Sequence, residues 1–295
     1  MPIAELTDVR CYYEVIGQGE PLVLIPGLGS TSAIWQPVLD HFSTHLSVVR
    51  FDNRDIGQSV GNRHPNTISD YSSDLIELLD HLQIDRAHVM GLSLGGIIAQ
   101  RLAIDYPARI DRLILVSCTH EFGPYLREIT RLVGQTLRWF PRAAFARTME
   151  ILGAGPTYLD AYPERIEKRL QQISEMGVPG KAIIRQLRAL AASNIKPNEY
   201  HIQSPTLVIS GEYDTFIPNC YARDMAKLIE DSNFMIVPEA GHNPFLDCPD
   251  RVLPVISQFL ETGLIGSIQK TDRSRTSKSN WDSRGAPTAL TSGRL

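Results

Sequence analysis

The chain has 295 residues, of which 43% are hydrophobic and 21% charged, as in a globular protein with one large core and room for a modest insertion. A formal net charge of −4, with no dense basic cluster before the C-terminal tail, gives no electrostatic basis for binding nucleic acid or an anionic membrane. The sequence contains no apolar run of the ~18 residues needed to span a membrane, and its first ten residues lack the apolar core of a signal peptide.

The four cysteines are far apart and form no C-x-x-C pair (Cys11, Cys118, Cys220 and Cys248). This spacing favours free thiols over a disulfide framework or a metal site, and we expect a cytoplasmic location.

Short apolar, β-rich segments alternate with helical patterns along the chain. Val9–Ile16 predicts an edge strand, and later strands are expected at residues 21–25, 48–51, 87–90, 113–116, 206–209 and 234–237. Helices are expected around Leu75, Leu78, Leu79 and Leu82 with Ser69 as N-cap, over 94–106 before Pro107, and over 249–260. This alternation predicts the α/β class, with a mostly parallel, twisted sheet and helices on both faces.

The segment 120–200 has a different character, because it carries helical patterns without a convincing strand. Helices are expected at 126–139, 164–176 and 182–192, separated by Pro and Gly. We therefore expect a core of residues 1–119 and 201–265 with an inserted helical lid at 120–200. Residues 266–295 are rich in Ser, Thr and Arg, which predicts a disordered tail.

The strongest motif is Gly91-Leu92-Ser93-Leu94-Gly95-Gly96, which follows a predicted strand and opens a predicted helix. This context is that of a nucleophile elbow, in which glycines two residues either side of the serine allow a strained turn. Ser93 is then the nucleophile and the N–H of Leu94 faces the oxyanion. The alternative is a strand-to-helix turn that merely needs small residues.

A serine nucleophile needs a histidine base and an acid that orients it. Asp214 follows the strand at 206–209, with Glu212 as the alternative acid, and His242 lies in a Gly/Pro-bounded loop after the last predicted strand. The order serine, acid, histidine, each just beyond a strand, predicts a catalytic triad rather than a surface histidine.

Together these segments resemble the landmarks of the α/β-hydrolase superfamily over about residues 5 to 262. Besides the triad motifs, the resemblance rests on Pro26-Gly27-Leu28-Gly29 and on Asp52-Asn53-Arg54-Asp55-Ile56-Gly57-Gln58-Ser59, which is similar to a carboxylesterase and methylesterase branch. It implies the N–H of Leu28 as a second donor of the oxyanion hole. Many relatives have His-Gly where this chain has Pro26-Gly27, so the hydrogen bonds that support this loop are expected to differ.

Several other sequence patterns resemble binding or catalytic motifs but are better explained by structural roles. Gly27-Leu28-Gly29 lacks the third glycine of a dinucleotide loop, and His41 and His45 lack the glutamate of an H-E-x-x-H zinc site. Asp52, Arg54 and Asp55 are expected to form a structural ion pair that braces their loop. Residues proposed to line a substrate pocket are Gly27, His120, Trp139 and Phe216.

The expected function is hydrolysis of a small-to-medium, fairly apolar carboxylic ester by a serine esterase that needs no cofactor and no metal. The same triad also serves C–C bond hydrolysis, amide hydrolysis, perhydrolysis and acyl transfer, which the sequence does not separate. A non-catalytic binding protein on this scaffold usually has a broken triad, and this one is complete. The natural ester and the oligomeric state are left open.

Overall fold

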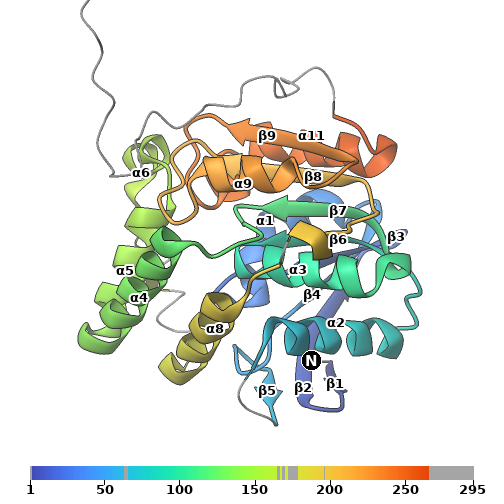
Figure 1. Ribbon diagram of the computed structural model, residues 1–295, viewed down its shortest axis with the longest axis horizontal. Coiled ribbons are helices and arrows are strands. Elements are labelled where there is room, and N and C mark those ends of the chain that lie inside the picture. Colours follow the sequence, from blue (N-terminus) through green and yellow to red (C-terminus); the bar gives the residue numbers. More distant parts are fainter. Residues whose placement is uncertain are drawn as a thin grey trace, which may run out of the picture.

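A computed structural model describes residues 2–265 except 63–65, 165–166, 168–169, 172–178 and 196. Its centre is a nine-stranded sheet in the order β1-β2-β4-β3-β6-β7-β8-β9, with β5 paired to β2 (Figure 1). The strands are β1 (Ile3–Glu5), β2 (Val9–Ile16), β3 (Glu20–Ile25), β4 (Leu46–Phe51), β5 (Val60–Gly61), β6 (Ala87–Leu92), β7 (Ile110–Val116), β8 (Thr206–Gly211) and β9 (Ser232–Val237). From β4 to β9 neighbouring strands are parallel, whereas β2 is antiparallel to β1, β4 and β5.

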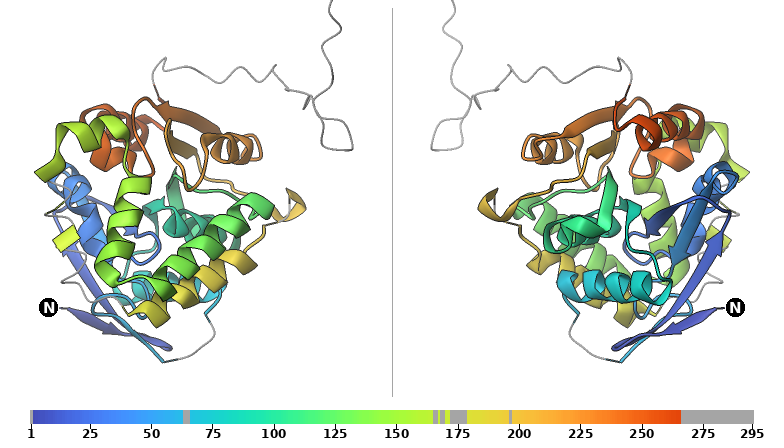
Figure 2. Two further views of the ribbon diagram at one scale, coloured as in Figure 1. Left: turned by 90° about the vertical axis from the view of Figure 1, so that its left-hand side faces the viewer. Right: turned by 90° about the vertical axis from the view of Figure 1, so that its right-hand side faces the viewer.

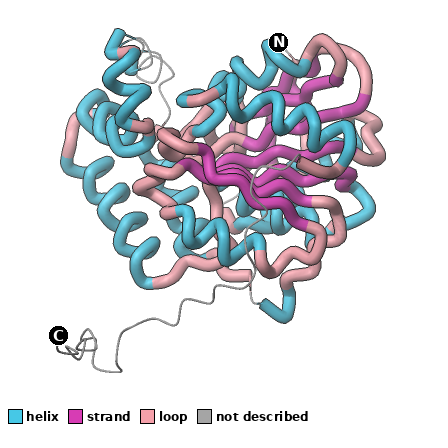
Figure 3. Tube along the Cα trace, turned by 90° about the horizontal axis from the view of Figure 1, so that it is seen from above, coloured by secondary structure: helices cyan, strands magenta, loops and turns pink. Residues whose placement is uncertain are grey.

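Helices cover both faces of this sheet (Figure 3). One face packs against α2 (Ile68–His81), α3 (Leu94–Asp105) and α9 (Asn219–Ala226), and the other against α1 (Gln36–Phe42), α10 (Pro244–Asp247) and α11 (Pro249–Thr262). Strands β3, β6, β7 and β8 are apolar on both sides because both faces are buried. Short 3₁₀ turns lie at η1 (Ser32–Trp35), η2 (Pro107–Arg109) and η3 (Pro197–Glu199).

Between β7 and β8 the chain forms α4 (Pro124–Trp139), α5 (Arg142–Gly153), α6 (Pro156–Ala161) and α8 (Gly180–Ala192). These helices gather at one side of the sheet, and α8 lies beside α4 (Figures 1 and 2). Buried Val133 of α4 packs with Ile183 and Leu187 of α8 and with Ile56 of the core, so apolar burial holds the inserted helices on the core.

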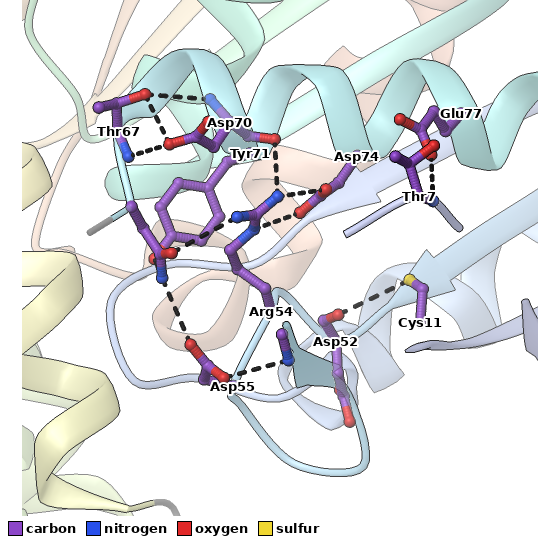
Figure 4. A network of polar contacts seen from close by, with 12 residues as sticks. Thr7, Cys11, Asp52, Arg54, Asp55, Thr67, Asp70, Tyr71, Asp74 and Glu77 are labelled. Carbon is purple, nitrogen blue, oxygen red and sulfur yellow. Dashed lines mark hydrogen bonds and ion pairs between the residues drawn. The ribbon is translucent and has the colours of Figure 1, made fainter. Parts of the chain in front are cut away.

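A buried polar network braces the loop that follows β4 (Figure 4). Arg54 makes a two-pronged ion pair with Asp74 of α2, at 2.7 and 2.6 Å, and its side chain is 3% exposed. Asp52 instead accepts hydrogen bonds from the backbone N–H groups of Ser32 and Gln58. The charged cluster of the sequence therefore has a structural role, but the partner of Arg54 comes from a helix about twenty residues away.

Two local expectations were wrong. Val9–Ile16 is an interior strand, because the short β1 adds outside it and pairs through Ile3 to Glu5. The N-cap of α2 is Thr67 rather than Ser69: the Thr67 hydroxyl accepts from the N–H of Asp70, whose carboxylate accepts from the N–H of Thr67. The predicted helix at 164–176 lies largely outside the described residues, as does the tail 266–295.

Asp74→Asn should destabilise the fold, because the guanidinium of Arg54 would remain buried without a compensating charge. We expect a loss of about 3–5 kcal/mol in the free energy of unfolding, measured by urea denaturation. Glu128→Gln is the control, since it breaks an exposed pair with Arg131 and should cost less than about 1 kcal/mol. Equal, small losses in both variants would contradict a bracing role for Arg54 and Asp74.

Candidate active site

Ser93 occupies a strained turn between β6 and α3. Its φ of 54° and ψ of −114° lie outside the regions that non-glycine residues favour. Its N–H donates to the carbonyl of Val116 at 2.9 Å, and its carbonyl accepts from the N–H of Ile97 in α3. The turn needs glycine on both sides, because a Cβ at Gly91 would overlap the backbone of Gly95 and a Cβ at Gly95 would overlap the carbonyl of Ile25.

Asp214 and His242 are brought together from the loops after β8 and β9. The Nδ1 atom of His242 lies 2.9 and 2.8 Å from the two carboxylate oxygens of Asp214, whose side chain is fully buried. The N–H groups of Phe216 and Ile217 donate to Asp214 Oδ1 and fix the carboxylate. The alternative acid, Glu212, turns away and accepts from the N–H of Glu239.

Ser93 and His242 both line a cavity of about 930 Å³ between the core and the inserted helices. Its walls come mainly from apolar side chains of α3, α4, α8 and the loops before α4 and after β8, namely Ile97, Phe122, Leu126, Ile129, Val133, Leu137, Ile183, Leu187, Leu190, Phe216 and Ile217. Among the described lining residues, Arg142 and Glu150 of α5 are the basic and acidic side chains besides His242.

The pocket residues proposed from the sequence divide into two pairs. Gly27 and Phe216 line the cavity, and the Phe216 ring packs edge-on against His242 at 5.3 Å between centroids. His120 and Trp139 are not among the described lining residues. Trp139 is 74% exposed at the end of α4, and His120 packs against Tyr200, where burial lowers the pKa of the imidazole.

Helix α5 supplies a wall of the cavity that sequence reasoning missed. Its lining residues are Arg142, Phe145, Ala146, Met149 and Glu150, and their spacing of three and four places them on one helical face. That stripe was visible in the sequence. What it faces depends on how α5 packs, and the stripe alone does not show this.

Asp247 is a second residue that sequence reasoning missed. Its Oδ2 atom accepts from the N–H of Gly241 at 2.7 Å and from the N–H of Gly155 at 2.9 Å. The N–H of His242 in turn donates to the carbonyl of Gly153 at 2.6 Å. The histidine loop is thus hydrogen-bonded directly to the end of α5, so the inserted helices help to hold His242 in place.

Cys118 lies beneath the serine turn, close enough that a Cβ at Gly96 would overlap its Sγ atom. Burial raises the pKa of this thiol far above its ordinary value. It therefore remains protonated at neutral pH and is no rival to Ser93 as a nucleophile. All four cysteines are free thiols.

The loop that follows β3 lies against Ser93, and Gly27, Leu28 and Gly29 all line the cavity. Leu94, the other expected oxyanion donor, is the first residue of α3. Within the described ranges, no group of three or more His, Cys, Asp or Glu is arranged to hold a metal ion, and no helix is long and apolar enough to cross a bilayer.

Comparisons with known proteins agree with this architecture. The chain is 30% identical over 237 residues to 3-oxoadipate enol-lactonase 2 of Acinetobacter baylyi, covering 80% of this chain and 87% of that protein. It is 27% identical over 258 residues to a protein of Caulobacter sp. strain K31 provisionally named carbamate hydrolase RutD, covering 84% and 95%.

Among solved structures, a thermophilic esterase from Thermogutta terrifontis superposes with a TM-score of 0.79 at 25% identity. The match covers 89% of this chain and 99% of the esterase. Residues 20–249 match the model of the alpha/beta hydrolase fold family. The chain therefore belongs to the alpha/beta hydrolase fold family.

Proposed function

We propose that this protein is a serine hydrolase that cleaves a small-to-medium, fairly apolar carboxylic ester through an acyl-enzyme on Ser93. The observation that carries this proposal is that Ser93 and His242 line one largely apolar cavity while Asp214 holds the Nδ1 side of His242. A histidine held in this way presents its Nε2 atom as a base, which is the arrangement that activates a serine hydroxyl.

In the proposed reaction, Ser93 Oγ attacks the ester carbonyl while His242 Nε2 takes the hydroxyl proton. The oxyanion of the tetrahedral intermediate accepts hydrogen bonds from the N–H groups of Leu28 and Leu94. His242 then donates the proton to the leaving alcohol, and an acyl group remains on Ser93. Water, deprotonated by His242, attacks the acyl-enzyme and releases the carboxylic acid with a free Ser93.

The names of similar proteins support an acyl carbonyl as the reacting group. An enol-lactone is a cyclic ester, and one solved relative is called an esterase. The similarity to a protein named as a carbamate hydrolase favours a second candidate, in which the same triad cleaves a carbamate. A panel that pairs aryl esters with aryl carbamates of the same leaving group separates the two candidates.

Ser93→Ala should abolish turnover of p-nitrophenyl esters, because the replacement removes the atom that forms the acyl-enzyme. We expect kcat to fall by about 10⁴-fold or more, measured as release of p-nitrophenol. Ser73→Ala is the control, since Ser73 is exposed on α2, away from the cavity. Hydrolysis by Ser93→Ala at the wild-type rate would contradict the proposal.

Val133→Trp should narrow the acyl-chain range, because Val133 is 5% exposed and faces the cavity from α4. We expect kcat/KM for a p-nitrophenyl octanoate to fall at least about tenfold relative to that for the acetate. Leu132→Trp is the matched control, as Leu132 is the next residue and is 52% exposed. An unchanged octanoate-to-acetate ratio in Val133→Trp would show that the acyl chain binds elsewhere.

A further inference from the structure

The backbone on either side of Leu28 has unusual conformational freedom. The proposed mechanism nevertheless requires the N–H of Leu28 to be directed at the oxyanion. Gly27 precedes Leu28 and Gly29 follows it, the latter with φ of 64°, and glycines restrict neighbouring peptide rotation less than other residues. From the core, Asn53 Nδ2 donates to the carbonyl of Pro26 at 3.2 Å and holds the start of the loop. The peptide between Leu28 and Gly29 needs support of its own.

That support comes from the inserted helices. The N–H of Gly29 donates to Gln186 Oε1 at 2.7 Å, across 157 residues of sequence. The Gln186 side chain projects from α8, which packs on the same loop through Ile183, whose side chain would lie 3.3 Å from a Cβ at Gly29. An ion pair of 2.9 Å between Arg185 and Asp55 also ties α8 to the core.

Burial of the Gln186 side chain at this position carries a free-energy penalty. The side chain is fully buried, and its Nε2 atom has no hydrogen-bond partner among the described residues. A buried donor without a partner typically costs about 1–3 kcal/mol. Leucine or methionine would fill a similar volume without that cost, so packing alone does not account for glutamine at this position. The bond that Oε1 accepts from Gly29 does account for it.

We propose that Gln186 is a positioning residue that fixes the Leu28–Gly29 peptide. Because this peptide shares the Cα of Leu28 with the Gly27–Leu28 peptide, fixing it restrains the backbone of Leu28 and helps to aim the N–H of Leu28 at the oxyanion. Gln186 also occupies the N–H of Gly29, which leaves Leu28 as the donor in this loop. The oxyanion hole is then complete only when α8 is docked on the core. This inference rests on the proposed acyl-transfer function, to which it adds a dependence on the inserted helices.

The variant that tests this is Gln186→Met, which keeps the length and volume of the side chain and removes the acceptor. We expect kcat for p-nitrophenyl esters to fall about tenfold, less than the 10²–10³-fold loss of an oxyanion donor itself, while KM changes less than about threefold. The thermal unfolding midpoint should change little, because removal of the unpartnered Nε2 is offset by the loss of the acceptor for the N–H of Gly29. If Gln186 had a purely structural role, Gln186→Met would lower the thermal unfolding midpoint and leave kcat unchanged.

Two further variants sharpen the comparison. Gln186→Glu keeps an oxygen that can accept from Gly29 and should retain more kcat than Gln186→Met. Arg188→Met places the same new side chain two residues away on the exposed side of α8 and should leave kcat unchanged. The inference is wrong if Gln186→Met keeps wild-type kcat, or if Gln186→Glu loses as much kcat as Gln186→Met.

Phenylboronic acid gives a readout that needs no ester substrate. Its boron accepts a bond from Ser93 Oγ, the hydroxyl proton passes to His242, and a boron-bound oxygen occupies the oxyanion position. We expect its Kd to rise in Gln186→Met by about the factor by which kcat falls, with wild-type affinity in Arg188→Met. Boronate binding that depends on Ser93 without any ester hydrolysis would contradict the proposed substrate, and the Kd values would then still decide the role of Gln186.

Discussion

The close contact between the Ser93 turn and strand β3 is the constraint on which the rest of the site depends. Ser93 is held at positive φ because glycines at 91 and 95 let β6 and α3 approach each other and the backbone of Ile25 without overlap. This contact puts the serine at the carboxyl edge of the parallel strands, where the loops after β3, β8 and β9 also begin. The loop with Leu28, the carboxylate of Asp214 and the ring of His242 are therefore brought to one place by the sheet.

The inserted helices do more than cover that edge. They contribute most of the apolar cavity wall, and the carbonyl of Gly153 accepts directly from the backbone of His242. Asp247 joins the histidine loop to Gly155, and Gln186 joins α8 to the loop after β3. The loop after β8 is also bonded to the insertion, because the Thr215 hydroxyl donates to the carbonyl of Leu152 at 2.6 Å. The packing of the insertion therefore affects site geometry as well as access to the cavity.

The buried polar groups around the site differ in how many of their hydrogen-bonding atoms have a partner. The carboxylate of Asp214 accepts two backbone N–H bonds besides that of His242, and the guanidinium of Arg54 faces both oxygens of Asp74. Among the residues that the structure describes, the amide of Gln186 is bonded on its oxygen side only. A fully bonded buried group rigidifies its surroundings, whereas a buried polar atom without a partner costs stability.

The sequence by itself determined the alternation of strands and helices, the strand-turn-helix at Ser93 and the order of Asp214 and His242, because these depend on local periodicity and turn chemistry. It did not show that Thr67 rather than Ser69 caps α2, or that Arg54 pairs with Asp74. Only the tertiary structure decided that His120 and Trp139 lie off the cavity, that α5 forms one of its walls and that Gln186 bonds Gly29. Such contacts join residues far apart in the chain, and they are set by how the helices dock, which local patterns do not specify.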